Sequence, residues 1–231
     1  MRQNATFESI SKISLDYNKL VEHELKVYLR QRAKSLTSII KRGREEYPIV
    51  ASTLSKKGLP ELLSNIAVIE SAYRPSAVSP AGAKGLWQFT AATGKNYGLV
   101  VTPLLDERNC PIRSTQAAAS LFANLYNAFG DWNLALAAYN AGEFGIKKAM
   151  ERTQARDFWE LAESGVLPEE TRRFVPRFIA VSIIDLLERT YGSDKIESNL
   201  SKHIALHSGR RLFALNISNK KSESREGRIL G

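Results

Sequence analysis

The chain has 231 residues, of which 43% are hydrophobic and 25% are charged. This is close to the composition of an average soluble globular protein and excludes a wholly disordered chain. The length allows one ordinary domain with an appendage, or two small domains. No apolar stretch reaches the roughly 18 residues needed to cross a bilayer, and residues 1–20 lack the apolar segment of a secretory signal peptide. The single cysteine, Cys110, excludes an internal disulfide and a cysteine-based zinc site.

The net charge of +9 is unevenly distributed along the chain. Residues 1–60 hold 12 Lys and Arg against 6 Asp and Glu, and residues 192–231 hold 8 against 4, whereas residues 61–191 hold 13 against 14. Basic ends suit a polyanion such as nucleic acid, anionic lipid or an acidic polymer, although an ordinary solvated surface has the same composition. No recognised nucleic-acid-binding motif accompanies them, so we expect no nucleic-acid partner.

The apolar pattern in the first part of the chain is helical. Leucine, isoleucine and tyrosine recur at helical spacing over residues 20–40, and the glycine and proline in residues 43–48 indicate a break. A further helix is expected over residues 49–57, stopped by Gly58. Pro60 suits the first position of the next helix, because its missing N–H is not needed there.

The middle of the chain also predicts helices, separated by one long loop. Proline, glycine and serine mark residues 75–86 as that loop. Asp131 is a suitable N-cap, and Gly130 and Gly142 are suitable helix stops. Helices are expected over residues 87–97, 111–129, 132–139, 144–152 and 171–191.

These elements predict one all-α domain over residues 20–191. Residues 1–19 form a polar N-terminal segment and residues 192–231 a basic C-terminal extension. We expect residues 1–19 and 218–231 to be loosely ordered. Within the extension, residues 204–217 have a weak strand-like alternation.

A glutamate stands where the helical pattern would continue an apolar face. Leu63, Ile66 and Ala67 lie on one face of the helix that follows Pro60, and the next turn of that face leads to Glu70. A carboxyl group on an apolar face loses hydration, which raises its pKa and lets it act as a general acid near neutral pH. From spacing alone, the alternative is a glutamate at a helix end that bends into water.

The residues after Glu70 are polar but contain no acid until Asp106. Residues 73–89 offer hydroxyls, an amide and aromatic rings instead. These groups suit a sugar, which needs hydrogen bonds at its edge and an apolar surface against its face. Gly82 and Gly85 would allow a backbone to approach a ligand closely.

Several motifs occur in a fixed order along the chain. They are ESAYRPSAVSPAGAKGLWQF from Glu70 to Phe89, LALAAYNAGE from Leu134 to Glu143, and ETRRFVPRFIA from Glu170 to Ala180. They resemble the motifs of lytic transglycosylases in the goose-lysozyme-like superfamily. The resemblance covers about residues 20–192 and is strongest to the membrane-bound murein transglycosylase D subgroup.

The resemblance implies an all-α, lysozyme-like catalytic domain with a substrate groove and N-terminal helices packed on it. It implies Glu70 as the single catalytic acid and base. Ser79 would hold an N-acetyl group or steady the reacting centre, and Gln88 would contact sugar. Tyr139 would hydrogen-bond near the catalytic carboxyl, with Asn140 beside it.

The role of Trp87 stays open at this point, because a tryptophan here suits both sugar binding and the core. A second carboxylate is not required by the resemblance, although Asp131 or Glu143 could supply one.

The implied substrate is peptidoglycan, cut between N-acetylmuramic acid and N-acetylglucosamine with formation of a 1,6-anhydro end. No metal or other cofactor is expected. Such a substrate implies a periplasmic or cell-envelope location. A hydrolytic goose-type lysozyme on the same fold and a non-catalytic peptidoglycan-binding assembly module remain as alternatives.

Overall fold

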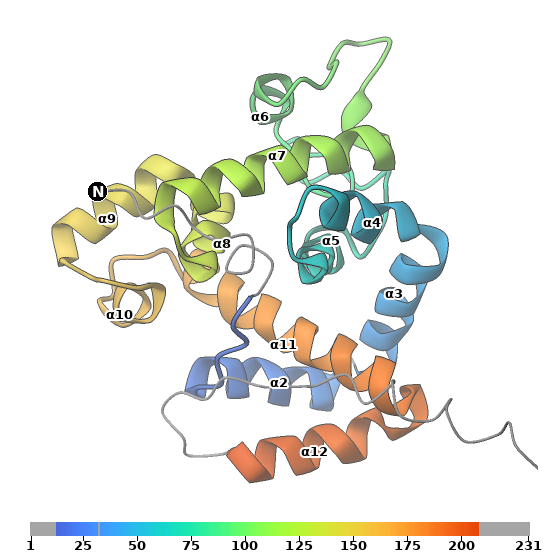
Figure 1. Ribbon diagram of the computed structural model, residues 1–231, viewed down its shortest axis with the longest axis vertical. Helices are drawn as coiled ribbons and strands as arrows, with labels where there is room; N and C mark the ends of the chain where they lie inside the picture. The colour runs from blue at the N-terminus through green and yellow to red at the C-terminus, as the bar shows by residue number, and fades with distance from the viewer. Residues whose placement is uncertain (1–12, 32, 208–231) are drawn as a thin grey trace, which may run out of the picture.

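The computed structural model describes residues 13–31 and 33–207. Within these ranges the chain is helical, apart from loops, turns and isolated β-bridges (Figure 1). This confirms the predicted all-α class. The elements, in chain order, are α2 (Lys19–Gln31), α3 (Ala33–Glu46), α4 (Pro48–Lys56), the 3-10 helix η1 (Glu61–Asn65), α5 (Ile66–Ser71), α6 (Ala91–Asn96), η2 (Glu107–Asn109), α7 (Pro111–Phe129), α8 (Trp132–Ala141), α9 (Glu143–Thr153), α10 (Phe158–Glu163), α11 (Glu169–Tyr191), η3 (Ser193–Lys195) and α12 (Ile196–His207).

The helices in the middle of the chain begin and end at the residues that local signals predict. Pro111 opens α7, and Gly130 ends it in the left-handed region with a φ of 68°. The side chain of Asp131 caps α8 by accepting a hydrogen bond from the Leu134 N–H at 2.8 Å. Gly142 ends α8. These signals act within one turn of the helix end, so the local sequence is enough to reveal them.

The break predicted within residues 43–48 is found at Tyr47, between α3 and α4. Gly43 does not form it, because α3 runs through this residue to Glu46. The helix expected over residues 20–40 is instead divided between α2 and α3. Gly43 is needed inside α3 because the ring of Tyr73 occupies the space where a side chain would lie. That contact joins two segments distant in the sequence, and no local pattern predicts it.

Two further boundaries differ from the predictions. Trp87 and Gln88 lie in a turn, Phe89 forms an isolated β-bridge with Lys84, and α6 is the helical part of the range expected at 87–97. Residues 204–207 belong to α12, so the strand-like expectation is wrong there, and the rest of 204–217 lies outside the described residues. At the other end, the side chains of Leu15 and Tyr17 are buried in the core, before the expected domain start at residue 20.

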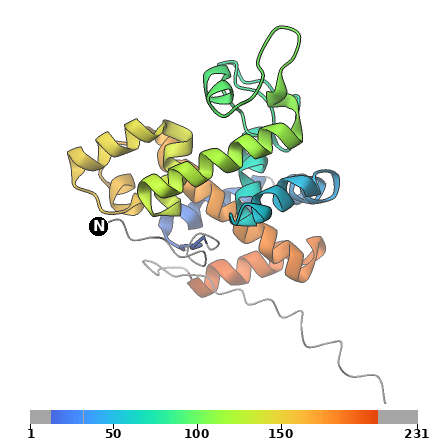
Figure 2. The same ribbon diagram turned by 45° about the horizontal axis from the view of Figure 1, so that its top comes forward.

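Helix α11 is the central element of the fold. It packs against α2, α8 and α12, and also contacts α3, α5 and η1. In Figure 1, α2, α11 and α12 lie below, and α7 crosses above α8 and near α5. The turned view shows α6 and the loop before α7 projecting together from the body (Figure 2). The helix that carries Glu70 therefore lies between the α7 region and α11.

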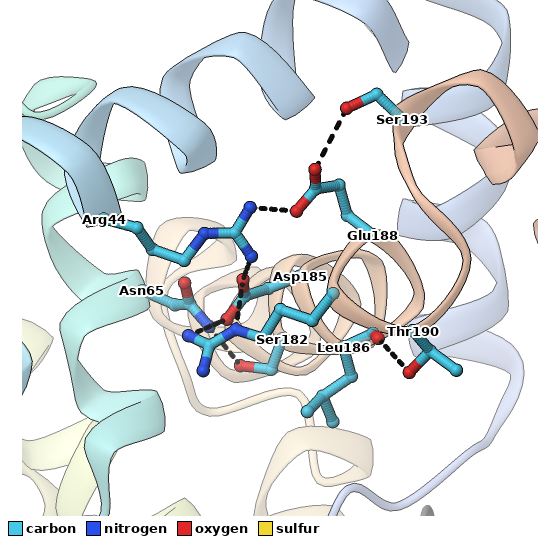
Figure 3. Close-up of polar contacts among 9 residues, drawn as sticks. Arg44, Asn65, Ser182, Asp185, Leu186, Glu188, Thr190 and Ser193 are labelled. Carbon is cyan, nitrogen blue, oxygen red and sulfur yellow. Dashed lines mark hydrogen bonds and ion pairs between the residues drawn. The ribbon is translucent and has the colours of Figure 1, made fainter. Parts of the chain in front are cut away.

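A buried polar cluster joins η1 to α3 and α11 (Figure 3). The Asp185 carboxylate is fully buried. It accepts hydrogen bonds from Arg44 at 3.1 Å, from Arg189 at 2.9 and 2.8 Å, and from the Asn65 amide at 3.3 Å. Asn65 is the last residue of η1, and α5 follows directly. The cluster therefore fixes the start of the short helix that carries Glu70.

Candidate active site

Glu70 lies in the last turn of α5. Ile66, one turn earlier on the same face, is fully buried. The helix ends at Ser71, one residue after Glu70, because Ala72 adopts the left-handed conformation with a φ of 50°. Tyr73 has a φ of 53°, and its hydroxyl donates to the Ser64 carbonyl at 2.9 Å. The chain thus turns back onto the core at once and leaves the Glu70 carboxyl at the edge of an apolar helix.

The surroundings of Glu70 disfavour its charged form. Burial, and to a smaller extent the negative charge of Glu170, raise the pKa of Glu70 from 4.5 to about 7. Burial and the neighbouring Glu70 also raise the pKa of the Tyr139 hydroxyl well above 10. Glu70 is therefore substantially protonated at neutral pH, and Tyr139 keeps its proton.

The structure brings all the site residues expected from the sequence to one cavity of about 360 Å³. Glu70 comes from α5, others come from the loop between α5 and α6, and the last two come from the end of α8. The predicted residues that line the cavity are Glu70, Ser79, Trp87, Gln88, Tyr139 and Asn140.

Ser79 and Gln88 are oriented by the loop that carries them. The Ser79 hydroxyl oxygen accepts from the Ala83 N–H at 3.0 Å, which leaves its proton for a ligand. The Gln88 amide nitrogen donates to the carbonyls of Gly85 at 2.9 Å and Ala77 at 3.3 Å. Its amide oxygen is then the group that can accept from a sugar hydroxyl.

Gly85 serves the loop itself rather than a ligand. It has a φ of 82°, and a Cβ at this position would overlap the backbone carbonyl of Arg108. The Arg108 guanidinium is almost fully buried, and it donates to the carbonyls of Gly82 and Phe89 at 3.0 and 3.1 Å. Asp106 pairs with Arg108 at 2.7 Å, and these hydrogen bonds hold the pKa of that carboxyl far below its ordinary value. An internal ion pair thus keeps the cavity loop in shape.

The Trp87 indole lies in the core. Its exposed fraction is 1%, and its Nε1–H donates to Thr115 at 3.0 Å. Its ring packs edge-on against Phe122, which in turn stacks on Tyr139. This favours the core interpretation of Trp87 over stacking on a sugar.

Tyr139 differs in one respect from the expectation. Its hydroxyl donates to the backbone carbonyl of Trp87. The phenol therefore lies close enough to Glu70 for their charges to interact, but its described donor bond goes to the backbone. Tyr139 joins α8 to the cavity loop and shapes the wall beside Glu70.

Glu170 is a carboxylate of this cavity that the sequence reasoning did not name. It lies in the first turn of α11, and its carboxylate accepts from the Asn140 amide at 3.5 Å. The oxygen of the same amide accepts from the Thr171 hydroxyl at 2.8 Å. The sequence signal that could have indicated it is the pair Glu170 and Thr171, which opens the motif ETRRFVPRFIA. Neither carboxylate named from the sequence lines this cavity: Asp131 caps α8, and Glu143 pairs with Lys147 at 2.5 Å.

Comparison with known proteins agrees with this geometry. The sequence model of the transglycosylase SLT domain matches residues 48–162. The membrane-bound lytic murein transglycosylase D of Escherichia coli is 36% identical over 186 residues, which cover 78% of this chain and 40% of that protein. The chain belongs to the lytic transglycosylase family. It spans less than half the length of that relative.

Two other proteins are also similar to this chain. A peptidoglycan transglycosylase of Escherichia phage T7 is 39% identical over 108 residues, which cover 46% of this chain and 8% of that protein. The crystal structure of the 70 kDa soluble lytic transglycosylase from Escherichia coli matches with a TM-score of 0.54 at 24% identity. That match covers 65% of this chain and 25% of the other, and it supports the all-α lysozyme-like fold.

A second cavity, of about 480 Å³, also reaches Glu70. It is lined by α2, α3, the end of α5 and α11. Among the described residues that line the two cavities, Glu70 is the one they share.

The part of the chain that the structure describes has no group of three or more His, Cys, Asp or Glu side chains suited to holding a metal ion. Across the same residues, no helix combines the length and apolar character needed to span a membrane.

Proposed function

We propose that this chain is a peptidoglycan lytic transglycosylase in which Glu70 is the catalytic acid and base. One observation carries the proposal: Glu70, whose pKa is raised by burial to about 7, lines both cavities. A glycan strand bound in both would present one glycosidic bond to that carboxyl. The family membership and the SLT domain match support the same substrate class.

The mechanism needs no activated water. Protonated Glu70 donates its proton to the glycosidic oxygen, and the C–O bond breaks to leave an oxocarbenium-like muramic acid. Glu70, now ionised, accepts the proton of the 6-hydroxyl of the same sugar as that oxygen attacks the anomeric carbon. This intramolecular attack has a high effective molarity. The product is a 1,6-anhydromuramic acid end, and Glu70 is protonated again.

The remaining cavity residues would hold the sugar. The Ser79 hydroxyl can donate to an N-acetyl carbonyl, and the Gln88 amide oxygen can accept from a hydroxyl. Asn140, fixed between Thr171 and Glu170, and the wall formed by Tyr139 restrict how the sugar lies. We also propose a cell-envelope location for the enzyme, because its substrate is found there.

A hydrolytic activity on the same fold is the second candidate. The observation that favours it is Glu170, whose carboxylate lines the cavity with Glu70 and could activate a water molecule. A non-catalytic peptidoglycan-binding module is excluded if the purified chain turns over its substrate.

Mass spectrometry of the fragments released from purified cell-wall sacculi tests both activities. Cyclisation leaves an end lighter by one water than the reducing end left by hydrolysis. We expect anhydro ends, and we expect Glu70→Gln to lower the rate by at least about 10²-fold because it removes the general acid. Glu163→Gln, an exposed glutamate of α10, is the matched control. Normal digestion by Glu70→Gln would contradict the assignment, and reducing ends would favour the lysozyme-like alternative.

A further inference from the structure

The turn that ends α5 has a backbone conformation that its residues rarely adopt. Ala72 and Tyr73 follow each other with φ values of 50° and 53°, in the left-handed region where glycine is the usual residue at a helix end. A side chain makes this conformation unfavourable, so it persists only where the surroundings hold it. Strained backbone of this kind gathers at functional sites, and here it begins two residues after Glu70.

The same turn closes the end of α5 around Glu70. The Ala72 N–H donates to the Val68 carbonyl at 3.1 Å, and the Tyr73 N–H donates to the Ala67 carbonyl at 3.0 Å. Glu70 lies within the stretch of chain that these two hydrogen bonds close. Because both donors belong to the turn, a change in its left-handed conformation would release the part of the helix that carries the carboxyl.

Tyr73 is held in this conformation by its own ring. The ring is buried, fills the space beside Gly43 of α3, and stacks on the ring of Tyr47 with the centroids 6.0 Å apart. Its hydroxyl donates to the Ser64 carbonyl at 2.9 Å. Ala72 has only a methyl group, which cannot anchor it in the same way.

A cation of α3 supplies the anchor that the Ala72 side chain lacks. The Arg42 guanidinium donates a hydrogen bond to the Ala72 carbonyl. A charged donor makes a stronger hydrogen bond than a neutral one, and a guanidinium keeps its charge at any pH at which proteins are folded. Arg42 is half-buried and lines neither of the two cavities that reach Glu70. Its link to the site therefore runs through the backbone of the turn.

We propose that Arg42 is a positioning residue for Glu70: it holds the left-handed turn after α5 in place and so keeps the carboxyl aligned at the cavity wall. The inference rests on the proposed function, in which one carboxyl both donates and accepts a proton. Such a group has to keep its position while the sugar reacts, because a small misplacement of a reacting group lowers the rate strongly. Loss of the hydrogen bond would let the turn relax and bring water to the carboxyl.

Kinetics of Arg42→Met on soluble glycan fragments test this role. We expect kcat to fall about tenfold while KM stays within about twofold of the native value, because the alignment of Glu70 is lost and not the binding of the sugar. A carboxyl that gains water has a lower pKa, so the loss of activity at high pH should move to lower pH, toward the ordinary 4.5. Destabilisation of the fold alone would lower the rate without moving this limb of the profile.

The shift can be assigned to hydration of Glu70 because its charged neighbours are the same in the variant. Arg42→Met leaves unchanged the charged side chains that line a cavity together with Glu70, which are Glu24, Arg74, Glu170, Arg173 and Arg177. Arg42→Lys keeps a charged donor and should recover part of kcat and of the position of the high-pH limb.

A second variant tests whether the effect passes through the strained turn. Glycine adopts the φ of Ala72 without strain, so in the Ala72→Gly background the turn depends less on Arg42. We expect Arg42→Met to lower kcat less in that background than in the native chain. Lys41→Met is the matched control, because Lys41 is the neighbouring residue of α3 and pairs with Glu45 at 3.8 Å. It should keep the native kcat and pH profile.

Thermal unfolding verifies that each variant is folded, and Arg42→Gln, which keeps a neutral donor, replaces Arg42→Met if the latter does not fold. An unchanged kcat and pH profile in the folded variant overturns the proposal, and so does an equal loss with and without Ala72→Gly. NMR titration of the Glu70 carboxyl, assigned by comparison with Glu70→Gln, measures its pKa without turnover. If the native chain releases no fragments and this pKa still falls in Arg42→Met, the proposed function fails and the positioning role stands.

Discussion

Asp185 and Glu70 are both buried carboxyl groups, but their surroundings are opposite. Asp185 receives hydrogen bonds from Arg44, Arg189 and Asn65, so its negative charge is compensated within the core. The charged neighbour that acts on Glu70 is Glu170, another carboxylate, and Glu70 opens onto two cavities.

The comparison distinguishes a carboxylate that stabilises the fold, Asp185, from a carboxyl suited to proton transfer, Glu70. A buried charge with several donors holds elements together, since removal of any partner leaves the others unsatisfied. A carboxyl that is poorly solvated and close to a like charge keeps its proton to a higher pH, which is the property that a general acid needs. Asp185, whose charge is compensated, fixes the start of α5, and Glu70, whose charge is not, lies near the end of the same helix.

The largest effect on stability is expected when the Asp185 carboxylate is removed. Asp185→Ala removes the acceptor that Arg44, Arg189 and Asn65 share, and we expect it to lower the free energy of unfolding by about 3 kcal/mol. The value lies at the low end for a broken buried pair because both arginines can partly reach water. Urea unfolding measures it. Asp194→Ala, at an exposed position in η3, should stay within about 0.5 kcal/mol of the native chain, and similar losses in both would contradict the role of the cluster.

Removal of the Glu70 carboxyl should instead raise the free energy of unfolding. The pKa of Glu70 is raised from 4.5 to about 7, because the folded protein favours the protonated form of this carboxyl. The fold therefore has its full stability below pH 4.5 and loses part of it as the pH rises through 7. Glu70→Gln abolishes that loss, and we expect a gain of about 2 kcal/mol at pH 8 with little change at pH 4. Thermal or urea unfolding at the two pH values measures the difference. A destabilised variant at pH 8, or an equal gain at pH 4, would show that Glu70 is not strained by burial.

The smallest effect concerns the charge that faces Glu70. Glu170→Gln removes the negative neighbour and should lower the pKa of Glu70, while burial continues to hold it above 4.5. The loss of activity at high pH should then move to lower pH, with a rate at pH 8 reduced about threefold. A pH–rate profile measures the shift, and Glu169→Gln is the neighbouring control. If Glu170→Gln instead converts the products to a different kind of end or abolishes activity at every pH, Glu170 takes part in the chemistry directly.

The sequence predicted those parts of the fold that depend on neighbouring residues. Pro111, Gly130, Asp131 and Gly142 set helix ends through groups within one turn, and these ends are where the structure has them. The break expected over residues 43–48 falls at Tyr47 and not at Gly43. Gly43 lies inside α3, where the ring of Tyr73, brought there only by the tertiary fold, leaves no room for a side chain.

The same distinction holds for the site. The position of Glu70 on an apolar face followed from helical spacing, and the residues expected beside it do line one cavity. The orientation of Trp87 into the core and the arrival of Glu170 from α11 depend on how distant helices pack. The sequence could not reveal them.

The cluster around Asp185 also bears on what can be cut from this chain or exchanged with a relative. The segment matched by the family runs from residue 48 to residue 162, and Asn65 lies inside it, but Arg44 and Asp185 lie outside. A fragment trimmed to those borders would leave the Asn65 amide and the apolar side of α5 facing water. The smallest transplantable piece that keeps Glu70 in place therefore extends from α3 to α11, well beyond the signature by which the family is recognised.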